Sequence, residues 1–531
     1  MKLRFISALV IYLKRKISSF FPLNSNLTNL RMGTISSIYL MIFLPLISSL
    51  LCQAFARKKM SFYFAITSCL ALFYLLLSAV PKVLLQKKIS SDFELFPLSI
   101  ALEFRLDLLS ITFLLLTIFV KVASLLFYKS DVDRLLDQKN SSIFYGVFLL
   151  QLFGLVGIFT SDNLLNLFLF FEVYAFGFFA NLTLSRDGKL LELFFRYFCL
   201  NAASSLLILF TFFTLYLAFG EVNFEKLSTS FSLLPQEQLG FATLILLILS
   251  LCMILKFFPF WLYFKKIKSS ELVSNFLAID SLFIKTNIGI FLALKFGYFF
   301  FGKKLLFEQL HIAPLVIGGS LLLIIYSALA LQKQKHLKLI SVYLCLNNVG
   351  FSLAAIAIHS KESLQALFFY LLNFNLVVFF IFIFASFLKR HFLTSSLTKI
   401  HLIRRNSFLL LLPLKILVFF VAAFPFTLLF FANWYMAYSS LQPSFVAVLL
   451  IGVALSTFAA SGLGIRLIDS FFAVENEEKN SAPPRFLAKE YSFYFASFWF
   501  LILLIGGGFF FVSSLNEFSL QFASYLLSNS L

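Results

Sequence analysis

Residues 161–176 read SDNLLNLFLFFEVYAF, a polar start followed by an apolar run that contains one glutamate, Glu172. Glu172 lies nine residues after Asn163, which in a helix is a depth of about 14 Å, near the middle of a hydrocarbon core about 30 Å thick. A carboxylate side chain is too short to reach water from that depth. Because an ionisable group costs free energy inside a membrane, the stretch predicts a spanning helix with a functional carboxylate at Glu172.

The whole chain has the composition of a membrane protein. Of its 531 residues, 61% are hydrophobic and 13% are charged, whereas soluble domains contain about 45–50% apolar and about 25% charged residues. We therefore predict an all-α, polytopic membrane protein of about fourteen transmembrane helices. The predicted spans are 36–55, 60–80, 107–127, 142–160, 163–184, 190–218, 239–262, 272–299, 312–331, 338–358, 363–387, 408–437, 443–465 and 491–513.

The predicted spans divide the chain into three parts: a basic N-terminal tail over residues 1–35, a transmembrane domain over residues 36–514 and a C-terminal tail over residues 515–531. The first 32 residues carry six Lys or Arg and no acidic residue. This composition is typical of a targeting peptide, of a segment that lies on the membrane surface or of a simple tail. The gaps between the spans are loop-sized, so no separate soluble domain is expected.

The net charge of +19 lies in short loops between the apolar runs rather than on a soluble face, so we do not expect binding to nucleic acid. Alternate loops carry 23 and 8 Lys or Arg residues. Because positively charged loops stay on the inner side of a membrane, the first set of loops should face the matrix or cytoplasm. With an even number of spans, both termini should lie on the opposite side.

Three lysines inside or near apolar runs are candidates for proton translocation. Lys285 lies about 13 residues into its predicted span and is followed by Thr286 and Asn287, which can bind water. Lys256 lies six residues from the end of its span, where snorkelling to the surface is the alternative. The depth of Lys415 in its span fits a functional and a structural role equally well.

The other interior polar residues favour simpler interpretations. Lys121 and Lys295 lie near span ends, where snorkelling is the expectation. Arg196 and Glu192, one helical turn apart, are expected to pair with each other or with the helix end. Several amides fall within successive spans, where hydrogen bonds that hold helices together are the expected role: Asn347, Asn348, Asn373 and Asn375.

No redox centre is readable in this chain. The five cysteines occur singly inside apolar runs, without a CxxC pair, and the five histidines are scattered. This pattern indicates neither a disulfide framework nor an iron–sulfur site. We therefore expect no cofactor in this chain.

Three segments carry a family resemblance: residues 161–176, quoted above, LFFRYFCLNAASSLLILFTFFTLYLAFGEVNFEKL at 193–227 and ALALQKQKHLKLISVYLCLNNVGFSLAAIAIHSKESLQALFFYLL at 328–372. In order and spacing they are similar to subunit 2 of respiratory complex I (NADH:ubiquinone oxidoreductase), called subunit N in bacteria, an antiporter-like membrane subunit. The resemblance covers about residues 107–440. It implies an antiporter-like fold with inverted repeats and with breaks in the seventh and twelfth helices.

The resemblance also implies roles for individual residues. Glu172 matches the essential carboxylate of the fifth helix and Lys285 the bridging lysine of the eighth helix, and Lys256 falls near the lysine of the seventh. The lysine of the twelfth helix falls on Asn433, for which Lys415 is the candidate replacement. A histidine frequent in the tenth helix falls on Asn348.

The implied function is proton translocation coupled to electron transfer from NADH to ubiquinone. NAD, FMN, iron–sulfur clusters and ubiquinone would then belong to the whole complex. The implied partners are lipids and other membrane-arm subunits, including antiporter-like subunit 4 and the small subunits next to the quinone module. The implied location is the mitochondrial inner membrane rather than a bacterial plasma membrane. Two alternatives stay open: a free-standing cation/proton antiporter, and a structural subunit with a degenerate proton channel.

Overall fold

A computed structural model describes most of the chain at the level of single residues. The described residues are 29–55, 58–93, 102–182, 184, 188–235, 238–257, 276, 278–302, 304–392, 397, 420–425, 427–440, 446–472 and 512–528. Within these ranges the protein is almost entirely helical, as the apolar runs predict, because a helix satisfies all backbone polar groups internally.

Among the described residues, eleven helices are long and apolar enough to cross a membrane. They agree with the first eleven predicted spans and confirm a polytopic helical fold. The total of fourteen spans and the breaks in helices seven and twelve stay predictions, since residues 258–275, 398–419 and 473–511 lie outside the described ranges. The helices of the first half are α2 (Asn29–Phe55), α3 (Lys58–Gln86), α4 (Leu108–Leu135), α5 (Gln138–Thr160), α6 (Leu164–Leu182), α7 (Gly188–Phe219), α8 (Phe224–Ser232) and α9 (Leu239–Phe257).

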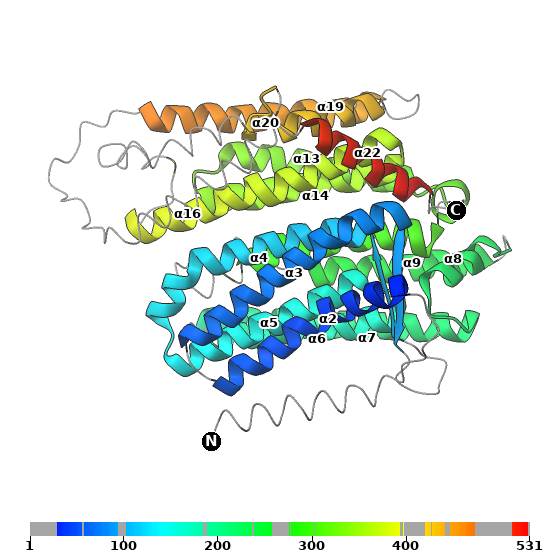
Figure 1. The fold of residues 1–531 in the computed structure, drawn as a ribbon. Coiled ribbons are helices and arrows are strands. Elements are labelled where there is room, and N and C mark those ends of the chain that lie inside the picture. The colour runs from blue at the N-terminus through cyan, green and yellow to red at the C-terminus, as the bar shows by residue number, and fades with distance from the viewer. Residues whose placement is uncertain are drawn as a thin grey trace, which may run out of the picture.

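The second half contains α-helices interrupted by π-helical turns, in which the backbone bonds skip one more residue than in an α-helix. These elements are η2 (Asp280–Ile284), α12 (Lys285–Leu294), η3 (Lys295–Phe300), η4 (Lys304–Gln309), α13 (Ala313–Lys333), α14 (Leu337–Ile358), α15 (Lys361–Asn373), η5 (Phe374–Val378), α16 (Phe379–Phe392), α19 (Leu428–Ser440), α20 (Val446–Phe472) and α22 (Val512–Ser528). Helices α2 to α7 lie together, and α13 to α20 form a second group beside them (Figure 1). The helix formed by η2, α12 and η3 contacts α4, α9 and α14 and so connects the two groups.

A two-stranded antiparallel sheet covers one end of the first group of helices. Strand β1 (Lys88–Phe93) pairs with β2 (Leu102–Asp107), with Lys88 opposite Asp107. The sequence placed residues 81–106 in a loop, so this sheet is an addition to the predicted all-α fold. Single backbone bridges join Phe104 to Ser161 and Asn163 to Asn223. We call this end of the molecule, with β1, β2, α8 and residues 161–163, the hairpin end.

The C-terminal helix α22 packs against α15 and α4, and the C-terminus lies near the strands in Figure 1. The hairpin end carries the loops with few positive charges, the side on which the charge pattern placed the C-terminus. The predicted domain boundaries stay predictions, although both fall within helices: residue 35 lies in α2 and residue 515 lies in α22.

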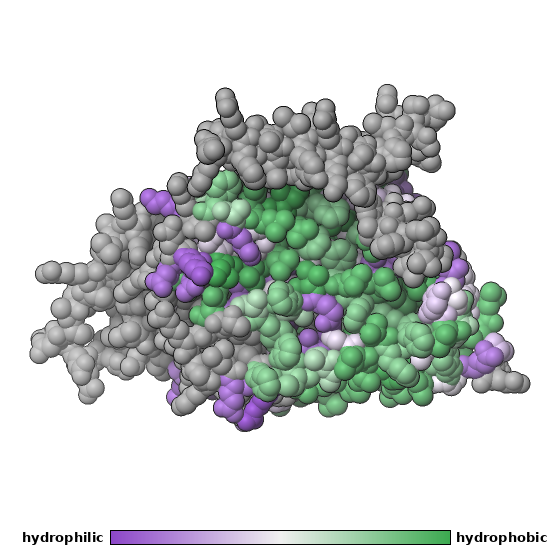
Figure 2. Space-filling model, turned by 90° about the horizontal axis from the view of Figure 1, so that it is seen from below, coloured by the Kyte–Doolittle hydropathy of each residue, from purple (hydrophilic) through white to green (hydrophobic). Residues whose placement is uncertain are grey.

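The outer helices present apolar side chains to the surroundings. Figure 2 shows a broad apolar area on the side seen from below, with hydrophilic residues mostly toward its edges. The exposed large side chains of α7 and α9 are typical of contact with lipid or with another membrane subunit: Phe195, Leu206, Phe210, Phe213, Leu217, Leu244, Leu247 and Leu251.

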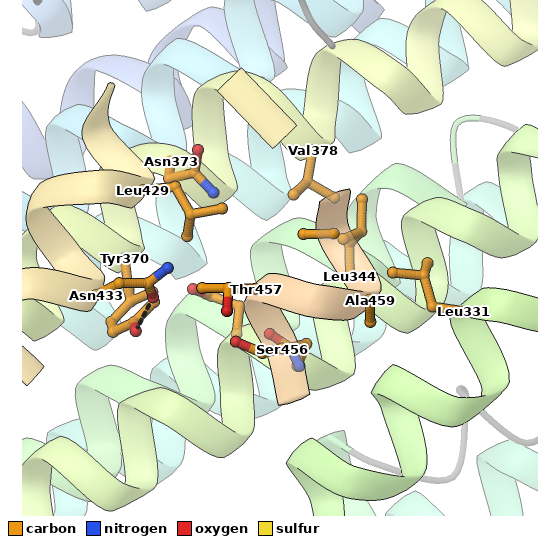
Figure 3. A pocket seen from close by; sticks show the side chains of 13 residues that line it. Leu331, Leu344, Tyr370, Asn373, Val378, Leu429, Asn433, Ser456, Thr457 and Ala459 are labelled. Carbon is orange, nitrogen blue, oxygen red and sulfur yellow. Dashed lines mark hydrogen bonds between the residues drawn. The ribbon is translucent and has the colours of Figure 1, made fainter. Parts of the chain in front are cut away.

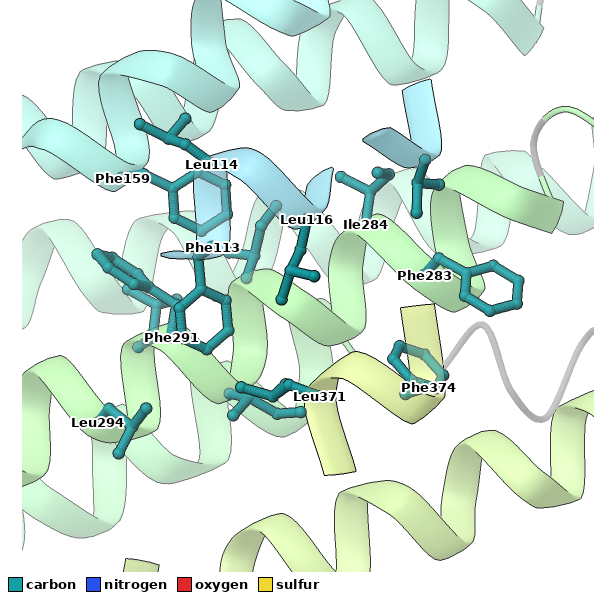
Figure 4. Close-up of a cluster of buried hydrophobic side chains, with 14 of the residues drawn as sticks. Phe113, Leu114, Leu116, Phe159, Phe283, Ile284, Phe291, Leu294, Leu371 and Phe374 are labelled. Atoms are coloured by element: carbon teal, nitrogen blue, oxygen red, sulfur yellow. The ribbon is translucent and has the colours of Figure 1, made fainter. Parts of the chain in front are cut away.

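Aromatic packing fills the space between α4, α5 and α12. The rings of Phe113, Phe159 and Phe291 lie in contact, with centroids 4.9 to 6.1 Å apart, and Figure 4 shows them between these helices. Such pairs contribute about 0.5–1.5 kcal/mol each beyond the burial of their area. Phe291 lies between Lys285 and Lys295 along the chain, so these aromatic rings form an apolar layer between the two lysines.

Helix α6, which carries Glu172, packs closely on α5 at Gly154. A Cβ atom at this position would lie 2.8 Å from the backbone nitrogen of Tyr174. Since backbone atoms cannot move alone, we expect Gly154→Ala to displace α6 and to destabilise the fold by about 1–3 kcal/mol. Thermal unfolding of the purified protein in detergent measures this loss. The matched control is Gly318→Ala in α13, where a Cβ atom would meet nothing within 4 Å, and equal melting temperatures for the two variants would contradict the prediction.

Candidate functional site

Glu172 on α6 and Lys256 on α9 form an ion pair, with 3.1 Å between Lys256 Nζ and Glu172 Oε1. Ser205 of α7 also donates a hydrogen bond to this carboxylate oxygen, at 2.7 Å. The Lys256 side chain is 4% exposed, so it is enclosed rather than snorkelling, whereas the Glu172 side chain is 40% exposed in the isolated chain. The pair therefore lies at the outer edge of the helix group, with the carboxylate toward the surroundings.

Lys285 is buried next to this ion pair. Its Nζ atom donates a hydrogen bond to the Tyr197 hydroxyl at 2.7 Å, and that hydroxyl donates to the carbonyl oxygen of Lys256 at 2.5 Å. The Lys285 ammonium also lies 3.6 Å from the ring centroid of Phe178. Tyr197 thus joins Lys285 to the helix that carries Lys256.

A small cavity lies where these groups meet. It is lined by Phe171, Tyr174, Ala175, Phe179, Tyr197, Asn201, Lys256 and Lys285, and it has room for about one water molecule. Two lysines and two tyrosines from four helices therefore border one shared space. Protons can move between such groups through a water molecule or by rotation of a hydroxyl.

A second ion pair, which the sequence did not indicate, lies deeper in the protein. Lys121 of α4 pairs with Asp280 of η2 and donates to Gln151 Oε1 at 3.0 Å. Both side chains of the ion pair are 2% exposed. The expectation that Lys121 snorkels to the surface is therefore wrong: α4 continues to Leu135, and the ammonium is enclosed by its partners. The other oxygen of Asp280 accepts a hydrogen bond from the Tyr174 hydroxyl at 3.1 Å.

Lys295 of η3 is also enclosed, contrary to the snorkelling expectation. Its ammonium donates to the carbonyl oxygen of Ser161 at 2.5 Å and lies 3.9 Å from the Asp162 carboxylate. The covering elements are α8 and residues 161–163, which the sequence did not place over this helix. Burial raises the pKa of Asp162, although the charges of Lys295 and Arg105 oppose this shift.

Arg105 of β2 joins three elements, β2, α8 and α22, at the hairpin end. Its side chain is 2% exposed and lies 3.4 Å from Asp107 and 2.5 Å from Glu225 of α8. It also donates to the Tyr525 hydroxyl of α22 at 3.0 Å, and Tyr525 donates to Asp107 at 3.0 Å. Burial alone would raise the pKa of Glu225, but the hydrogen bond from Lys88 and the charge of Arg105 bring that pKa below its usual value.

The second group of helices contains a polar cavity without a charged side chain among its described lining residues. Figure 3 shows it between α14, α15, α19 and α20. Asn433 accepts a hydrogen bond from the Tyr370 hydroxyl at 2.6 Å. The lining residues are Leu331, Leu344, Asn347, Asn348, Tyr370, Asn373, Val378, Leu429, Asn433, Ser456, Thr457, Ala459 and Ala460.

Asn287 of α12 and Asn375 of η5 join the connecting helix to the second group of helices by paired amide hydrogen bonds of 2.7 and 3.1 Å. Asn375 thus holds two helices together, as expected, by its hydrogen bonds to Asn287 of α12. Asn347 likewise donates to the hydroxyl of Ser327 on α13, at 3.1 Å. The expected contact between Arg196 and Glu192 is present as an exposed pair at 2.7 Å.

A family model described as "NADH:quinone oxidoreductase/Mrp antiporter, TM" matches residues 161–459, more than half of the chain. The chain belongs to this family of membrane proteins. The matched region contains Glu172, Lys256, Lys285 and Asn433.

Individual relatives come from both branches of the NADH:quinone oxidoreductase/Mrp antiporter family. NADH-quinone oxidoreductase subunit N of Wolbachia sp. subsp. Brugia malayi is 25% identical over 315 residues, which are 59% of this chain and 66% of the relative, just under two thirds of its length. A Na⁺/H⁺ antiporter subunit from Bacillus subtilis is 25% identical over 239 residues, 45% of this chain and 47% of the relative.

The fold of the family is also recognisable in solved structures. A chain of respiratory complex I from Thermus thermophilus with bound NADH superimposes with a TM-score of 0.69, at 18% identity, over 92% of this chain and 99% of that chain. At this identity the likeness concerns the fold, and it confirms the antiporter-like architecture.

Of the four site residues predicted from the sequence, the structure brings three together: Glu172, Lys256 and Lys285. Lys415 lies outside the described residues. The main residues that sequence reasoning missed are Asp280 and Tyr197. Asp280 is an acidic residue five positions before Lys285 in AIDSLFIK. It lies inside a predicted span, as Glu172 does, and this position alone could have identified it as a candidate.

Proposed function

We propose that this chain is a core membrane-arm subunit of a complex I-type NADH:quinone oxidoreductase and contributes to proton translocation. The observation that carries the proposal is the Glu172–Lys256 ion pair, joined through Tyr197 to the buried Lys285. Fold alone would not support a function, because one fold serves many activities.

The proposed mechanism uses the ion pair as a switch. Burial disfavours the charged form of an amine, whereas a nearby carboxylate favours it. While Glu172 pairs with Lys256, the positive charge of Lys256 is compensated and Lys285 can hold a proton. When the pair opens, the uncompensated charge of Lys256 repels a proton on Lys285 across the shared cavity, and that proton leaves.

The choice of complex I over an antiporter rests on loops outside the site. The Gln334–Lys335 loop and the loop from Gly220 to Leu227 resemble those of subunit 2. A cation/proton antiporter is the second candidate function, because a Na⁺/H⁺ antiporter subunit is among the relatives and such proteins would use the same buried charges.

The whole complex would supply what this chain lacks. NAD, FMN, iron–sulfur clusters and ubiquinone would be bound by other subunits, and electrons would not pass through this chain. Its partners would be lipids and further membrane-arm subunits, including antiporter-like subunit 4 and the small subunits beside the quinone module. For the location we propose the mitochondrial inner membrane, since the 77 phenylalanines fit the codon bias of an AT-rich organelle genome.

A structural subunit with a degenerate channel is the third candidate, which Asn433 in place of a lysine favours. The discriminating feature is whether Glu172 and Lys285 are isolated from each other and from polar surroundings. Their connection through Tyr197 and the shared cavity argues against this candidate. If the chain does pump protons, the polar cavity around Asn433 would hold water but no charged side chain among its described lining residues.

Purification of the tagged full chain from its native membrane in mild detergent should bring flavin- and iron–sulfur-containing subunits with it, together with NADH:quinone reductase activity. An unrelated carrier from the same membrane, tagged in the same way, is the control. Recovery of the chain with membrane subunits alone, together with sodium/proton exchange in vesicles, would replace the proposal by the antiporter function.

A further inference from the structure

The Lys121–Asp280 ion pair lies in the membrane interior, apart from the Glu172–Lys256 pair. Gln151 and the rings of Phe148 and Phe276 complete the surroundings of Lys121, with 4.9 and 5.8 Å from Nζ to the ring centroids. A buried ion pair of this kind gives little net stability, since apolar residues of similar volume often do as well. Stability alone is therefore a weak reason for two charges at this place.

Asp280 reaches from this ion pair to the cavity of the candidate site. One carboxylate oxygen pairs with Lys121, and the other accepts the hydrogen bond from Tyr174. Tyr174 lines the cavity together with Lys285 and Lys256. A single side chain, that of Tyr174, therefore connects the Asp280 carboxylate to the space that borders Lys285.

The π-helical turn η2 brings Asp280 and Lys285 to the same side of their helix. In an α-helix, residues five apart point about 140° away from each other. In η2 the Lys285 amide donates to the Asp280 carbonyl oxygen, five residues before it, so Lys285 follows Asp280 after about one full turn. Such turns are frequent at functional sites.

The charges around Lys285 do not balance. Among the described residues, this part of the interior holds five acidic or basic side chains, three lysines and two carboxylates: Lys121, Lys256, Lys285, Glu172 and Asp280. When all five are ionised, one lysine lacks a carboxylate. Glu172 serves Lys256, so Asp280 is the carboxylate that Lys121 and Lys285 share.

We propose that Asp280 is a proton-transfer residue that delivers protons to Lys285 through Tyr174, and that Lys121 holds the Asp280 carboxylate in position for this transfer. This proposal rests on the proposed function and adds two residues to it. In the transfer, the O–H bond of a protonated Asp280 breaks and an N–H bond forms at the Lys285 amine. The Tyr174 hydroxyl, by rotation and with a water molecule in the cavity, passes the proton between them. Asp280 is then a carboxylate again and pairs with Lys121.

The test measures proton pumping per assembled complex in vesicles for three variants. Asp280→Asn keeps the size of the side chain and one of its two acceptor oxygens but cannot transfer the proton, and pumping should fall at least about tenfold. Asp280→Glu keeps an acid and should retain most of the pumping. The double variant Lys121→Met/Asp280→Asn removes both charges. If the pair were only structural, the double variant would recover the activity of the wild type, whereas the proposal requires it to stay as low as Asp280→Asn.

An infrared difference spectrum of the complex on protonation gives a readout besides pumping. The carbonyl band of a buried protonated carboxyl should be present in the wild type, absent in Asp280→Asn and retained in Glu172→Gln. Full pumping by the double variant, or an unchanged band in Asp280→Asn, would overturn the proposal. If Glu172→Gln pumps fully as well, the proposed function itself fails, and if only the Asp280 variants pump fully, the role of Asp280 alone fails.

Discussion

Proton pumping by the assembled complex should fall at least about tenfold when Glu172 is replaced by glutamine. Glutamine keeps the size of the side chain and can still accept the hydrogen bond from Ser205, but it has no charge to hold Lys256. The uncompensated ammonium of Lys256 then disfavours a second positive charge on Lys285, which shares the cavity. We expect normal amounts of assembled complex, because the Glu172 side chain is 40% exposed and the pair is not fully enclosed.

Glu221→Gln is a closely matched control for this prediction. The Glu221 side chain is also 40% exposed and also pairs with a lysine, Lys226, at 3.1 Å, but it lies at the hairpin end. Initial rates of acidification in vesicles, at equal complex content, compare the two variants. Equal loss of pumping in both would mean that any lost surface charge has this effect, and the switch would be rejected.

Replacement of Arg105 by methionine should destabilise the protein by about 3–5 kcal/mol. Methionine has a similar length but leaves the buried carboxylate of Asp107 without a positively charged partner, and it removes one of the two hydrogen bonds that hold Tyr525 of α22. We expect α22 to detach from the hairpin end first. Limited proteolysis should then cut the variant near its C-terminus, and thermal unfolding in detergent should occur at a lower temperature.

Lys88→Met tests whether this loss comes from burial. Lys88 also pairs with Glu225, at 2.8 Å, but both side chains are about half exposed, and such surface pairs contribute about 0–1 kcal/mol. This variant should resist proteolysis as the wild type does. A C-terminal helix that stays protected in Arg105→Met would show that Arg105 does not hold β2, α8 and α22 together.

The sequence predicted the first eleven spans and drew attention to three residues that the structure brings together, because both depend on local properties. Long apolar runs need no tertiary information to predict a membrane helix, and a charge such as Glu172 in the middle of such a run is conspicuous by itself. The partners of Glu172 and Lys285 could not be predicted in the same way. Tyr197 contacts Lys285 from a different helix, and phenol groups are common in apolar runs.

The burial of Lys121 and Lys295 could not be predicted from their position in the sequence. Both lysines lie near the ends of apolar runs, so their short distance from the membrane surface predicted that they snorkel to water. Lys121 finds its carboxylate 159 positions further along the chain, at Asp280, and Lys295 is covered by a loop and by α8. The enclosure of a helix end depends on what folds over it, and the apolar runs do not predict this.

The number of protons moved per electron tests the central claim most directly. NADH oxidation and proton movement would be recorded together in vesicles that contain the wild-type complex or Glu172→Gln, with Glu221→Gln as the control. If this chain pumps protons through Glu172, Lys256 and Lys285, the ratio falls in Glu172→Gln while the control keeps the wild-type value. An unchanged ratio in an assembled Glu172→Gln complex would contradict the account and leave the chain as a structural subunit.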